Sequence, residues 1–199
     1  MGKIYCVMGK SSSGKDSIYR ELLRRGELPL EAIVPYTTRP VREGEIPGKD
    51  YIFCDEERVQ QLADERRIIE LRAYQTVHGI WKYFTVDDGQ IDLEHRSYLY
   101  IVTLEGYIRI REYFGAHRVE PIYIEVEDGE RLMRAIARER QQPVPRYEEM
   151  CRRFLADAGD FSEEKLMEAG VAVRFSNEEF EETVRRVSEY IRAEEKSQS

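Results

Sequence analysis

The sequence predicts an α/β fold in which a parallel β-sheet is covered by helices on both faces, with a small, mostly β subdomain inserted in the middle. Strand-like and helix-like segments alternate in both flanks of the 199-residue chain, which is typical of parallel sheets with crossover helices. Between residues 37 and 85, short β-favouring segments follow one another instead. The length suits one such domain, since domains usually contain ~100–200 residues.

The first flank contains one strand and one helix. Residues 4–8 are apolar and β-favouring and end at Gly9, as expected for a buried strand that runs into a turn. A helix is predicted from 17 to 25, because its apolar residues share one face and Gly26 is suited to end it.

The second flank contains three strand-like segments, at 97–102, 122–126 and 171–175. Apolar residues at helical spacing predict helices between and after these strands. These residues are Tyr107, Ile110 and Phe114 in the first helix, Leu132, Met133 and Ile136 in the second, and Phe180, Val184, Val187 and Ile191 in the last.

The inserted segment contains strand-like stretches at 51–53, 68–69 and 80–84. One helix is predicted near 55–62. This pattern differs from the regular alternation on either side, and therefore indicates a subdomain with its own small sheet.

Composition excludes several classes of protein. The formal net charge is −8, so a broad basic surface for nucleic acid is not expected. No apolar run exceeds five residues, so neither a membrane-spanning helix nor a signal peptide is predicted. The three separated cysteines form neither a metal-binding pair nor a disulfide framework. We therefore expect a cytoplasmic protein, either a monomer or a homodimer, whose partners are small molecules rather than nucleic acid or membrane.

Arginine is far more frequent in this chain than lysine, the other strongly basic residue. The chain has 24 arginines and seven lysines. Arginine binds phosphate and carboxylate groups through two parallel hydrogen bonds, so the positions of these residues bear directly on function.

A phosphate-binding loop follows the first predicted strand. The segment 9–17 (GKSSSGKDS) matches the P-loop pattern G-x-x-x-x-G-K and lies between a predicted strand and a predicted helix, as that motif requires. Backbone N–H groups and the helix N-terminus would bind phosphate oxygens, with Lys15 reaching the β- and γ-phosphates of ATP. An ordinary Gly/Ser-rich turn before a helix is the alternative. The predicted nucleotide-contacting residues are Gly9, Ser11, Ser12, Ser13, Gly14, Lys15, Asp16 and Ser17. The motif specifies the fold class further, as a P-loop NTPase-type sheet.

Asp16 stands where the motif usually has the Ser or Thr whose hydroxyl contacts Mg²⁺. A carboxylate can also bind Mg²⁺, so Asp16 is a candidate metal ligand. It also brings negative charge close to a polyphosphate.

A second informative stretch runs from 36 to 53 (YTTRPVREGEIPGKDYIF). Arg39 and Arg42 lie three residues apart in a loop bounded by Pro and Gly and followed by Tyr51, so they could converge on one phosphate. Taken alone, the stretch is better explained as a solvated basic loop. Together with the P-loop, it resembles the guanylate kinase family, whose pattern T-T-R-x-x-R-x-x-E-x-x-G-x-x-Y-x-F is filled here at every fixed position.

The resemblance covers most of the chain and implies a nucleoside monophosphate kinase that uses ATP and Mg²⁺. It implies a core (1–36, 97–130 and 154–193), an acceptor-binding subdomain (37–96) and a mobile lid (131–153). The residues implied to contact the acceptor, GMP in the first instance, are Thr38, Arg39, Arg42, Tyr51 and Glu70. Glu70 stands where the family uses a carboxylate to accept hydrogen bonds from guanine.

The implied lid contains seven arginines and no lysine, and the segment 141–145 (QQPVP) divides it into two helical arms. The resemblance implies that Arg134, Arg138 and Arg153 act with Lys15 as catalytic residues, because phosphoryl transfer requires neutralisation of charge on the transferred group. Ion pairs with neighbouring glutamates on exposed helix faces are the alternative for several of the lid arginines.

Asn177 resembles the residue that the family places beside adenine. However, Ser176 and Glu179 form a capping-box pattern, which would make Asn177 the first residue of the last helix instead. Both interpretations remain open from the sequence.

Departures from the family pattern affect recognition of the base and the metal. The usual Tyr-Gly-Ser segment is Lys82-Tyr83-Phe84 here, and the Asp at the end of the third core strand is Thr103. The G-K-D-S sequence of the P-loop also resembles the ribosyl bisphosphate phosphokinases. The sequence therefore favours phosphorylation of a nucleoside monophosphate by ATP, with GMP giving GDP. Phosphorylation of ribose 1,5-bisphosphate and a non-catalytic guanylate-kinase-like binding module are the alternatives.

Overall fold

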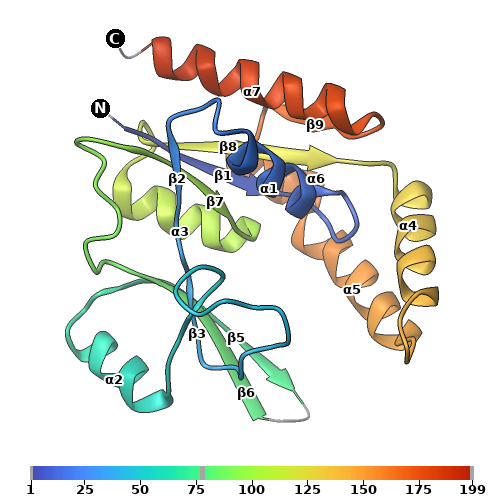
Figure 1. Ribbon diagram of the computed structural model, residues 1–199, viewed down its shortest axis with the longest axis horizontal. Helices are drawn as coiled ribbons and strands as arrows, with labels where there is room; N and C mark the ends of the chain where they lie inside the picture. Colours follow the sequence, from blue (N-terminus) through green and yellow to red (C-terminus); the bar gives the residue numbers. More distant parts are fainter. Residues whose placement is uncertain (1, 77–78, 198–199) are drawn as a thin grey trace.

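The chain folds around a five-stranded, all-parallel sheet with the strand order β2-β7-β1-β8-β9 (Figure 1). The structure is a computed structural model and describes residues 2–76 and 79–197. The α/β class with a parallel sheet and helices on both faces, predicted from the sequence, is confirmed. The strands are β1 (Ile4–Met8), β2 (Leu30–Ala32), β7 (Ser97–Ile101), β8 (Val119–Glu125) and β9 (Arg174–Ser176).

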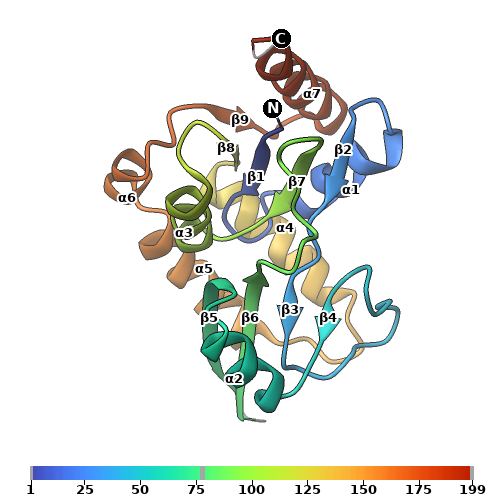
Figure 2. The same ribbon diagram turned by 90° about the vertical axis from the view of Figure 1, so that its left-hand side faces the viewer.

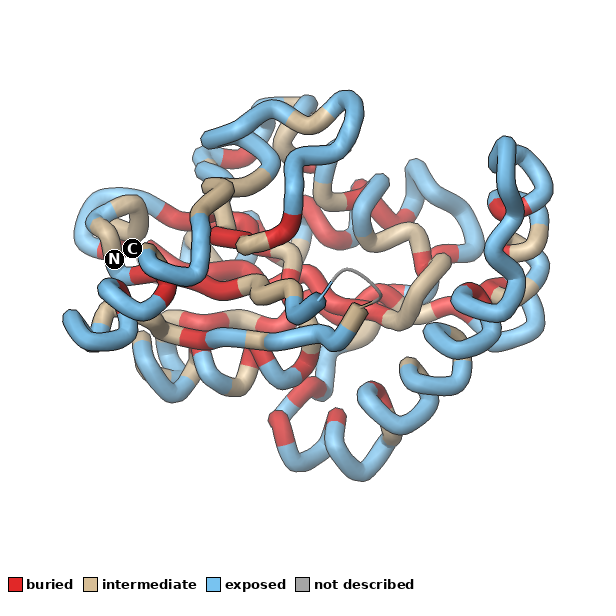
Figure 3. Tube along the Cα trace, turned by 90° about the horizontal axis from the view of Figure 1, so that it is seen from below, coloured by how far each residue is buried: buried red, intermediate tan, exposed pale blue. Residues whose placement is uncertain are grey.

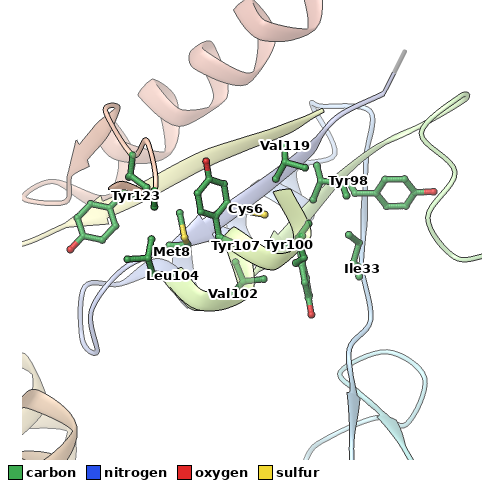
Figure 4. Close-up of a cluster of buried hydrophobic side chains, with 14 of the residues drawn as sticks. Cys6, Met8, Ile33, Tyr98, Tyr100, Val102, Leu104, Tyr107, Val119 and Tyr123 are labelled. Carbon is green, nitrogen blue, oxygen red and sulfur yellow. The ribbon is translucent and has the colours of Figure 1, made fainter. Parts of the chain in front are cut away.

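The two faces of this sheet bury different helices, because successive side chains of a strand point to opposite sides. Cys6 and Met8 of β1 pack with α3 (Leu104–Phe114) and α6 (Glu163–Glu168). Figure 4 shows this cluster, including Tyr107 of α3. On the other face, β1 residues Tyr5 and Val7 pack against α1 (Lys15–Arg25) and α7 (Phe180–Lys196). The central strand is therefore fully buried, as its apolar sequence predicts.

A second sheet, with the strand order β4-β3-β6-β5, lies below the main sheet (Figure 2). Helix α2 packs on it through Val59 and Leu62, in a separate small hydrophobic cluster with Phe84. The mostly β composition predicted for this segment is confirmed. Its elements are β3 (Tyr36–Thr37), β4 (Ile52–Phe53), α2 (Glu56–Asp64), β5 (Ile68–Thr76) and β6 (Gly79–Val86).

Two helices extend beyond the carboxyl end of β8 and lie side by side (Figure 1). They are α4 (Asp128–Arg140) and α5 (Tyr147–Asp160), and the break predicted at 141–145 falls between them. Buried residues are concentrated in β1, β7 and β8 at the centre of the main sheet, while α4 and α5 are largely exposed; Figure 3 shows the burial along the chain. Within the described ranges, no helix is long and apolar enough to cross a membrane.

Helix α1 begins at Lys15, two residues earlier than predicted, because the P-loop leads directly into its first turn. The short β2 and α6 were not predicted from the sequence, since each has too few apolar residues to show a period. The last strand is β9, at Arg174–Ser176 rather than 171–175.

The capping-box prediction at the last helix is wrong. Helix α7 begins at Phe180 with Glu179 as its N-cap residue, so Asn177 lies outside the helix. The hydroxyl of Ser176 donates to Glu178 instead of capping a backbone N–H. Ser176 is the last residue of β9, where pairing with β8 fixes its backbone in an extended conformation.

Candidate active site

The P-loop joins the carboxyl end of β1 to α1, where backbone geometry requires glycine at its last turn. Gly14 has φ 85° and ψ 4° and is the N-cap residue of α1. A Cβ atom here would lie 2.4 Å from Nδ2 of Asn177, so a larger residue would face both backbone strain and a steric clash. The loop therefore keeps a tight bend at the helix N-terminus, which is the geometry that binds phosphate.

Several hydrogen-bonding groups of the loop lack an internal partner. The hydroxyl oxygens of Ser12 and Ser13 are buried and have no hydrogen bond within the described part of the chain. Buried hydroxyls are usually paired, so two adjacent unpaired ones indicate a site built for a ligand. Lys15 lies beside them in the first turn of α1, with its Nζ 3.3 Å from the carboxylate of Asp16. These groups fit the oxygens of a polyphosphate.

Asp16 lies in the first turn of α1 with its carboxylate exposed. The helix N-terminus stabilises negative charge at this position. Mg²⁺ in nucleotide sites is commonly held by one or two carboxylates together with the phosphates, so an oxygen ligand beside the P-loop lysine fits this ion. Asp16 is thus the side chain of the loop that could bind the metal.

Asn177 holds the P-loop from the adjacent end of β9. The side-chain Nδ2 of Asn177 donates to the carbonyl oxygen of Ser13 at 2.8 Å, and its backbone N–H donates to the carbonyl oxygen of Glu125 at 2.9 Å. Only 4% of the residue is exposed. Of the two interpretations open from the sequence, a residue beside adenine or the first residue of a helix, the second is wrong, and Asn177 lies against the loop that is predicted to bind the phosphates.

Arg131 is a residue of the site that sequence analysis did not select. It is buried at the start of α4, and its guanidinium donates to the carbonyl oxygen of Ser11 at 2.9 Å and to Asp128 at 2.7 Å. The hydrogen bond that Arg131 donates lowers the pKa of the Asp128 carboxyl below its usual value. The carboxylate of Asp157, on α5, accepts from the N–H of Ser11 at 2.7 Å. Ser11 is therefore held on both backbone groups by the helices that extend from the main sheet.

Arg39 forms the centre of the loop between β3 and β4. Its guanidinium donates to both carboxylate oxygens of Glu45, at 2.7 Å for Nη1, and to the carbonyl of Pro40 at 2.9 Å. The hydrogen bond from Arg39 lowers the pKa of the Glu45 carboxyl. Its Nε is buried with no partner among the residues described here, and its Cζ lies 4.7 Å from the ring centre of Tyr51. The Nε donor of this buried cation is therefore left unsatisfied within the described part of the chain.

Arg42 and Thr38 lie on the same loop. The backbone N–H of Arg42 also donates to Glu45, at 2.8 Å, while its exposed guanidinium lies 5.9 Å from the ring centre of Trp81. Thr38 accepts a hydrogen bond at its hydroxyl from the N–H of Lys82 at 3.0 Å. Arg39 thus lies beside Tyr51, and Glu45 binds both the Arg39 guanidinium and the Arg42 backbone N–H. Thr38 secures this loop to β6, and the anion site predicted here stays a prediction.

Glu70 on β5 lies at the centre of a buried polar network between the two sheets. Arg72 donates to both of its carboxylate oxygens, from Nε at 3.0 Å and from Nη2 at 3.3 Å. The hydroxyl of Thr85 donates to the same carboxylate at 2.8 Å and lies 2.8 Å from the hydroxyl of Tyr100. Because Thr85 has one hydroxyl hydrogen, Tyr100 must be the donor to Thr85. Tyr100 belongs to the main sheet and Thr85 to the second, so this network connects the two.

The three predicted lid arginines have different surroundings. Arg134 donates to Glu130 at 2.9 Å and to the carbonyl of Asn177 at 3.2 Å, close to the P-loop. Arg153 lies on α5 and forms a long ion pair with Glu149, at 3.7 Å. Arg138 is exposed near the end of α4, and its guanidinium has no hydrogen bond or ion pair with residues 2–76 or 79–197.

Comparisons with known proteins agree on one family. A sequence model described as guanylate kinase matches residues 1–194. The chain is 27% identical over 203 residues to the guanylate kinase of Anaplasma phagocytophilum, covering 98% of this chain and 88% of the relative. Its fold is similar to the crystal structure of guanylate kinase from Anaplasma phagocytophilum, with a TM-score of 0.64 and 26% identity over 97% of this chain and 86% of that one.

Other similarities cover shorter stretches. The chain is 32% identical over 87 residues to a guanylate kinase of Rhodopirellula baltica, covering 44% of this chain and 41% of the relative. It is 41% identical over 70 residues to one of Legionella pneumophila, covering 35% of this chain and 32% of the relative. The chain thus spans less than half the length of these two relatives in the matched regions.

Proposed function

The chain belongs to the guanylate kinase family. We therefore propose that it transfers the γ-phosphoryl group of ATP to a nucleoside monophosphate. GMP is the acceptor that we propose first, and GDP is then the product. The observation that carries this proposal is the pair of anion-binding loops in one molecule. One loop has buried hydroxyls at Ser12 and Ser13 that have no hydrogen-bond partner among residues 2–76 and 79–197. The other has a buried cation, Arg39, whose Nε likewise has no partner in these ranges. A reaction that joins two phosphates needs two such loops.

Each loop has a distinct task in this proposal. The P-loop binds the phosphates of ATP through its backbone N–H groups, the two serine hydroxyls and Lys15. Arg39 and Arg42 bind the phosphate of the acceptor, with Tyr51 beside Arg39. Residues 37–96 form the acceptor-binding subdomain and the remaining strands form the core. Catalysis then consists mainly of holding the two phosphates in line, since phosphoryl transfer needs little covalent help from the protein.

The helices α4 and α5 carry the cations that would cover the transferred group. Residues 131–153 act as the lid, and Arg134, Arg138 and Arg153 neutralise charge in the transition state. The exposed guanidinium of Arg138 supports this role, because it is not already engaged by a carboxylate within the described residues. Closure of the lid would also exclude water, which otherwise competes as an acceptor.

When bound, Mg²⁺ would supply positive charge that offsets the negative charge of the ATP phosphates. Asp16 is the proposed protein ligand of the ion, as the exposed carboxylate next to Lys15. Asn177 keeps the loop in shape through Ser13 and lies where the family places a residue beside adenine.

The proposal is tested by measuring ADP release with ATP and MgCl₂ against GMP, dGMP, AMP, UMP, CMP and ribose 1,5-bisphosphate. Turnover of GMP is expected. Turnover of ribose 1,5-bisphosphate alone would replace the nucleotide assignment, and no turnover with any acceptor would exclude a kinase of this class.

ATP binding separates an enzyme from a non-catalytic binding module. Calorimetry should detect ATP binding that is lost in Lys15→Ala and retained in Lys10→Ala. Lys10 is a suitable control, because it lies in the same loop but its Nζ is directed at Asp128, 3.4 Å away. Failure of the intact protein to bind ATP would favour the binding module.

A further inference from the structure

The carboxylate of Glu70 is covered by Arg72. Only 1% of the Glu70 side chain is exposed, and both oxygens accept hydrogen bonds, from Arg72 on one side and from Thr85 on the other. Arg72 lies two residues along the same strand, so the two side chains project from the same face. A ligand that approaches this position meets the guanidinium first.

Arg72 retains hydrogen-bonding capacity after these contacts. A guanidinium has five N–H donors. Nε donates to Glu70, one N–H of Nη2 donates to Glu70, and one N–H of Nη1 donates to Thr103 at 3.4 Å. One N–H on each terminal nitrogen is therefore left without a partner among the described residues. Two adjacent N–H groups of this kind match a pair of adjacent acceptors.

The surroundings of Arg72 favour a ligand that offers acceptors. Thr103 accepts the N–H of Gly106 at 3.2 Å as the N-cap of α3, so the residue beside Arg72 at the start of this helix carries a hydroxyl. Arg72 also lines a cavity of about 240 Å³ between β5 and α3, and the other charged residues of its lining are Glu70, Glu105 and Arg109. The half-buried guanidinium, with 14% of its side chain exposed, is thus held in place at the edge of an open space.

We propose that Arg72 is a specificity-determining residue that reads the O6 and N7 acceptors of a 6-oxopurine monophosphate, while Glu70 positions Arg72 and does not contact the base. This inference rests on the proposed function, in which GMP is the acceptor and β5 belongs to the acceptor-binding subdomain of residues 37–96. Paired donation from arginine to O6 and N7 is the commonest specific contact of proteins with guanine in DNA. Arg72 thus selects 6-oxopurine monophosphates by their O6 and N7 acceptors. The 2-amino group of guanine does not contribute to this selection.

Equilibrium binding of GMP, IMP and 7-deaza-GMP to the intact protein, measured by calorimetry, tests the assignment. GMP and IMP share O6 and N7 and differ by the 2-amino group, so we expect affinities within about threefold of each other. 7-deaza-GMP lacks the N7 acceptor and should bind at least about tenfold more weakly.

Variants at position 72 give the complementary test. Arg72→Ala uncovers the Glu70 carboxylate, which can then accept from N1 and the 2-amino group, so preference for GMP over IMP should rise to at least about tenfold. Arg72→Lys keeps a cation beside Glu70 but lacks paired donors; both nucleotides should weaken together and their ratio should stay near one. Arg109→Ala, in the same cavity, is the matched control and should leave the ratio and the N7 dependence unchanged.

The outcomes distinguish this inference from the proposed function. Preference of the intact protein for GMP over IMP of about tenfold or more, or equal binding of GMP and 7-deaza-GMP, would overturn the role of Arg72 even if GMP is phosphorylated. Equal binding of GMP and IMP with dependence on N7, but without turnover, would support the role of Arg72 and overturn the kinase proposal. If neither nucleotide binds, both are overturned.

Discussion

The guanidinium of Arg131 donates a hydrogen bond to the carbonyl oxygen of Ser11 at 2.9 Å, although the two residues are 120 positions apart. The N–H of the same Ser11 donates to Asp157. One P-loop residue is thus attached to both α4 and α5, so the position of these helices and the shape of the phosphate-binding loop depend on each other.

Arg131→Ala is expected to destabilise the protein and weaken ATP binding. The side chain is 1% exposed and packs over Phe154, so its loss leaves the carboxylate of Asp157 without its cation. Breaking a buried ion pair in this way costs about 3 kcal/mol. Urea unfolding measures the stability. Calorimetry under conditions where the variant is folded measures its ATP affinity.

Arg152→Ala is the matched control for Arg131. Arg152 lies on the same pair of helices, but it is exposed and pairs with Glu149 on the surface. Its loss should change the free energy of unfolding by no more than about 0.5 kcal/mol and leave ATP affinity intact. If both substitutions changed stability and ATP affinity equally, the contact between Arg131 and Ser11 could not be the cause of the effect of Arg131→Ala.

The parts of the fold that could be predicted from sequence are those set by contiguous residues. The P-loop could be located because its glycines, Lys15 and the flanking strand and helix follow one another directly. The acceptor loop could be located for the same reason, since Arg39 and Arg42 stand within a few residues of Glu45, which holds both.

The contacts that escaped prediction join distant segments. Arg131 could not be distinguished in sequence from the other six arginines of residues 131–153, because its burial depends on the packing of α4 against the P-loop. The capping-box reading of Ser176 failed because strand pairing with β8 outweighs a local cap. That Arg72 covers Glu70 also depends on strand geometry rather than on any motif.

Asp16→Ser is expected to raise the Mg²⁺ concentration needed for half-maximal activity at least about fivefold, because a hydroxyl is a weaker ligand than a carboxylate. Calorimetric titration of ATP in the presence and absence of MgCl₂ should show the same reduced coupling. Asp64→Ser, on the exposed end of α2, is the control and should change neither value. An unchanged Mg²⁺ requirement in Asp16→Ser would exclude the carboxylate from metal binding.

Arg42→Ala is expected to raise KM for the acceptor by about tenfold or more with little change in kcat. The exposed guanidinium would grip the acceptor phosphate equally in the ground state and the transition state. Steady-state kinetics with GMP varied at saturating ATP measure both constants. Arg58→Ala, whose guanidinium donates only to Gln61 on α2 among the described residues, should leave both unchanged.

Arg138→Ala is expected to lower kcat by about a hundredfold or more with a small change in KM, because an arginine that acts on transferring charge contributes mainly in the transition state. Arg140→Ala is the matched control, two residues further on α4 and also exposed. A pure KM effect of Arg138→Ala would assign this residue to ground-state binding.

Acidification should break the ion pair between Arg39 and Glu45, because it protonates the Glu45 carboxylate. The hydrogen bond from Arg39 lowers the pKa of Glu45, so the stability that this carboxylate contributes is present above its unfolded pKa of about 4.3 and is lost as the pH falls through the lower folded value. Glu45→Gln should therefore cost about 2 kcal/mol of unfolding free energy at pH 7. Urea unfolding from pH 7 to pH 3 should show that the difference in unfolding free energy between the unaltered protein and Glu45→Gln decreases below about pH 4.3. A gap that stays constant over this range would mean that Glu45 stabilises the loop without its charge.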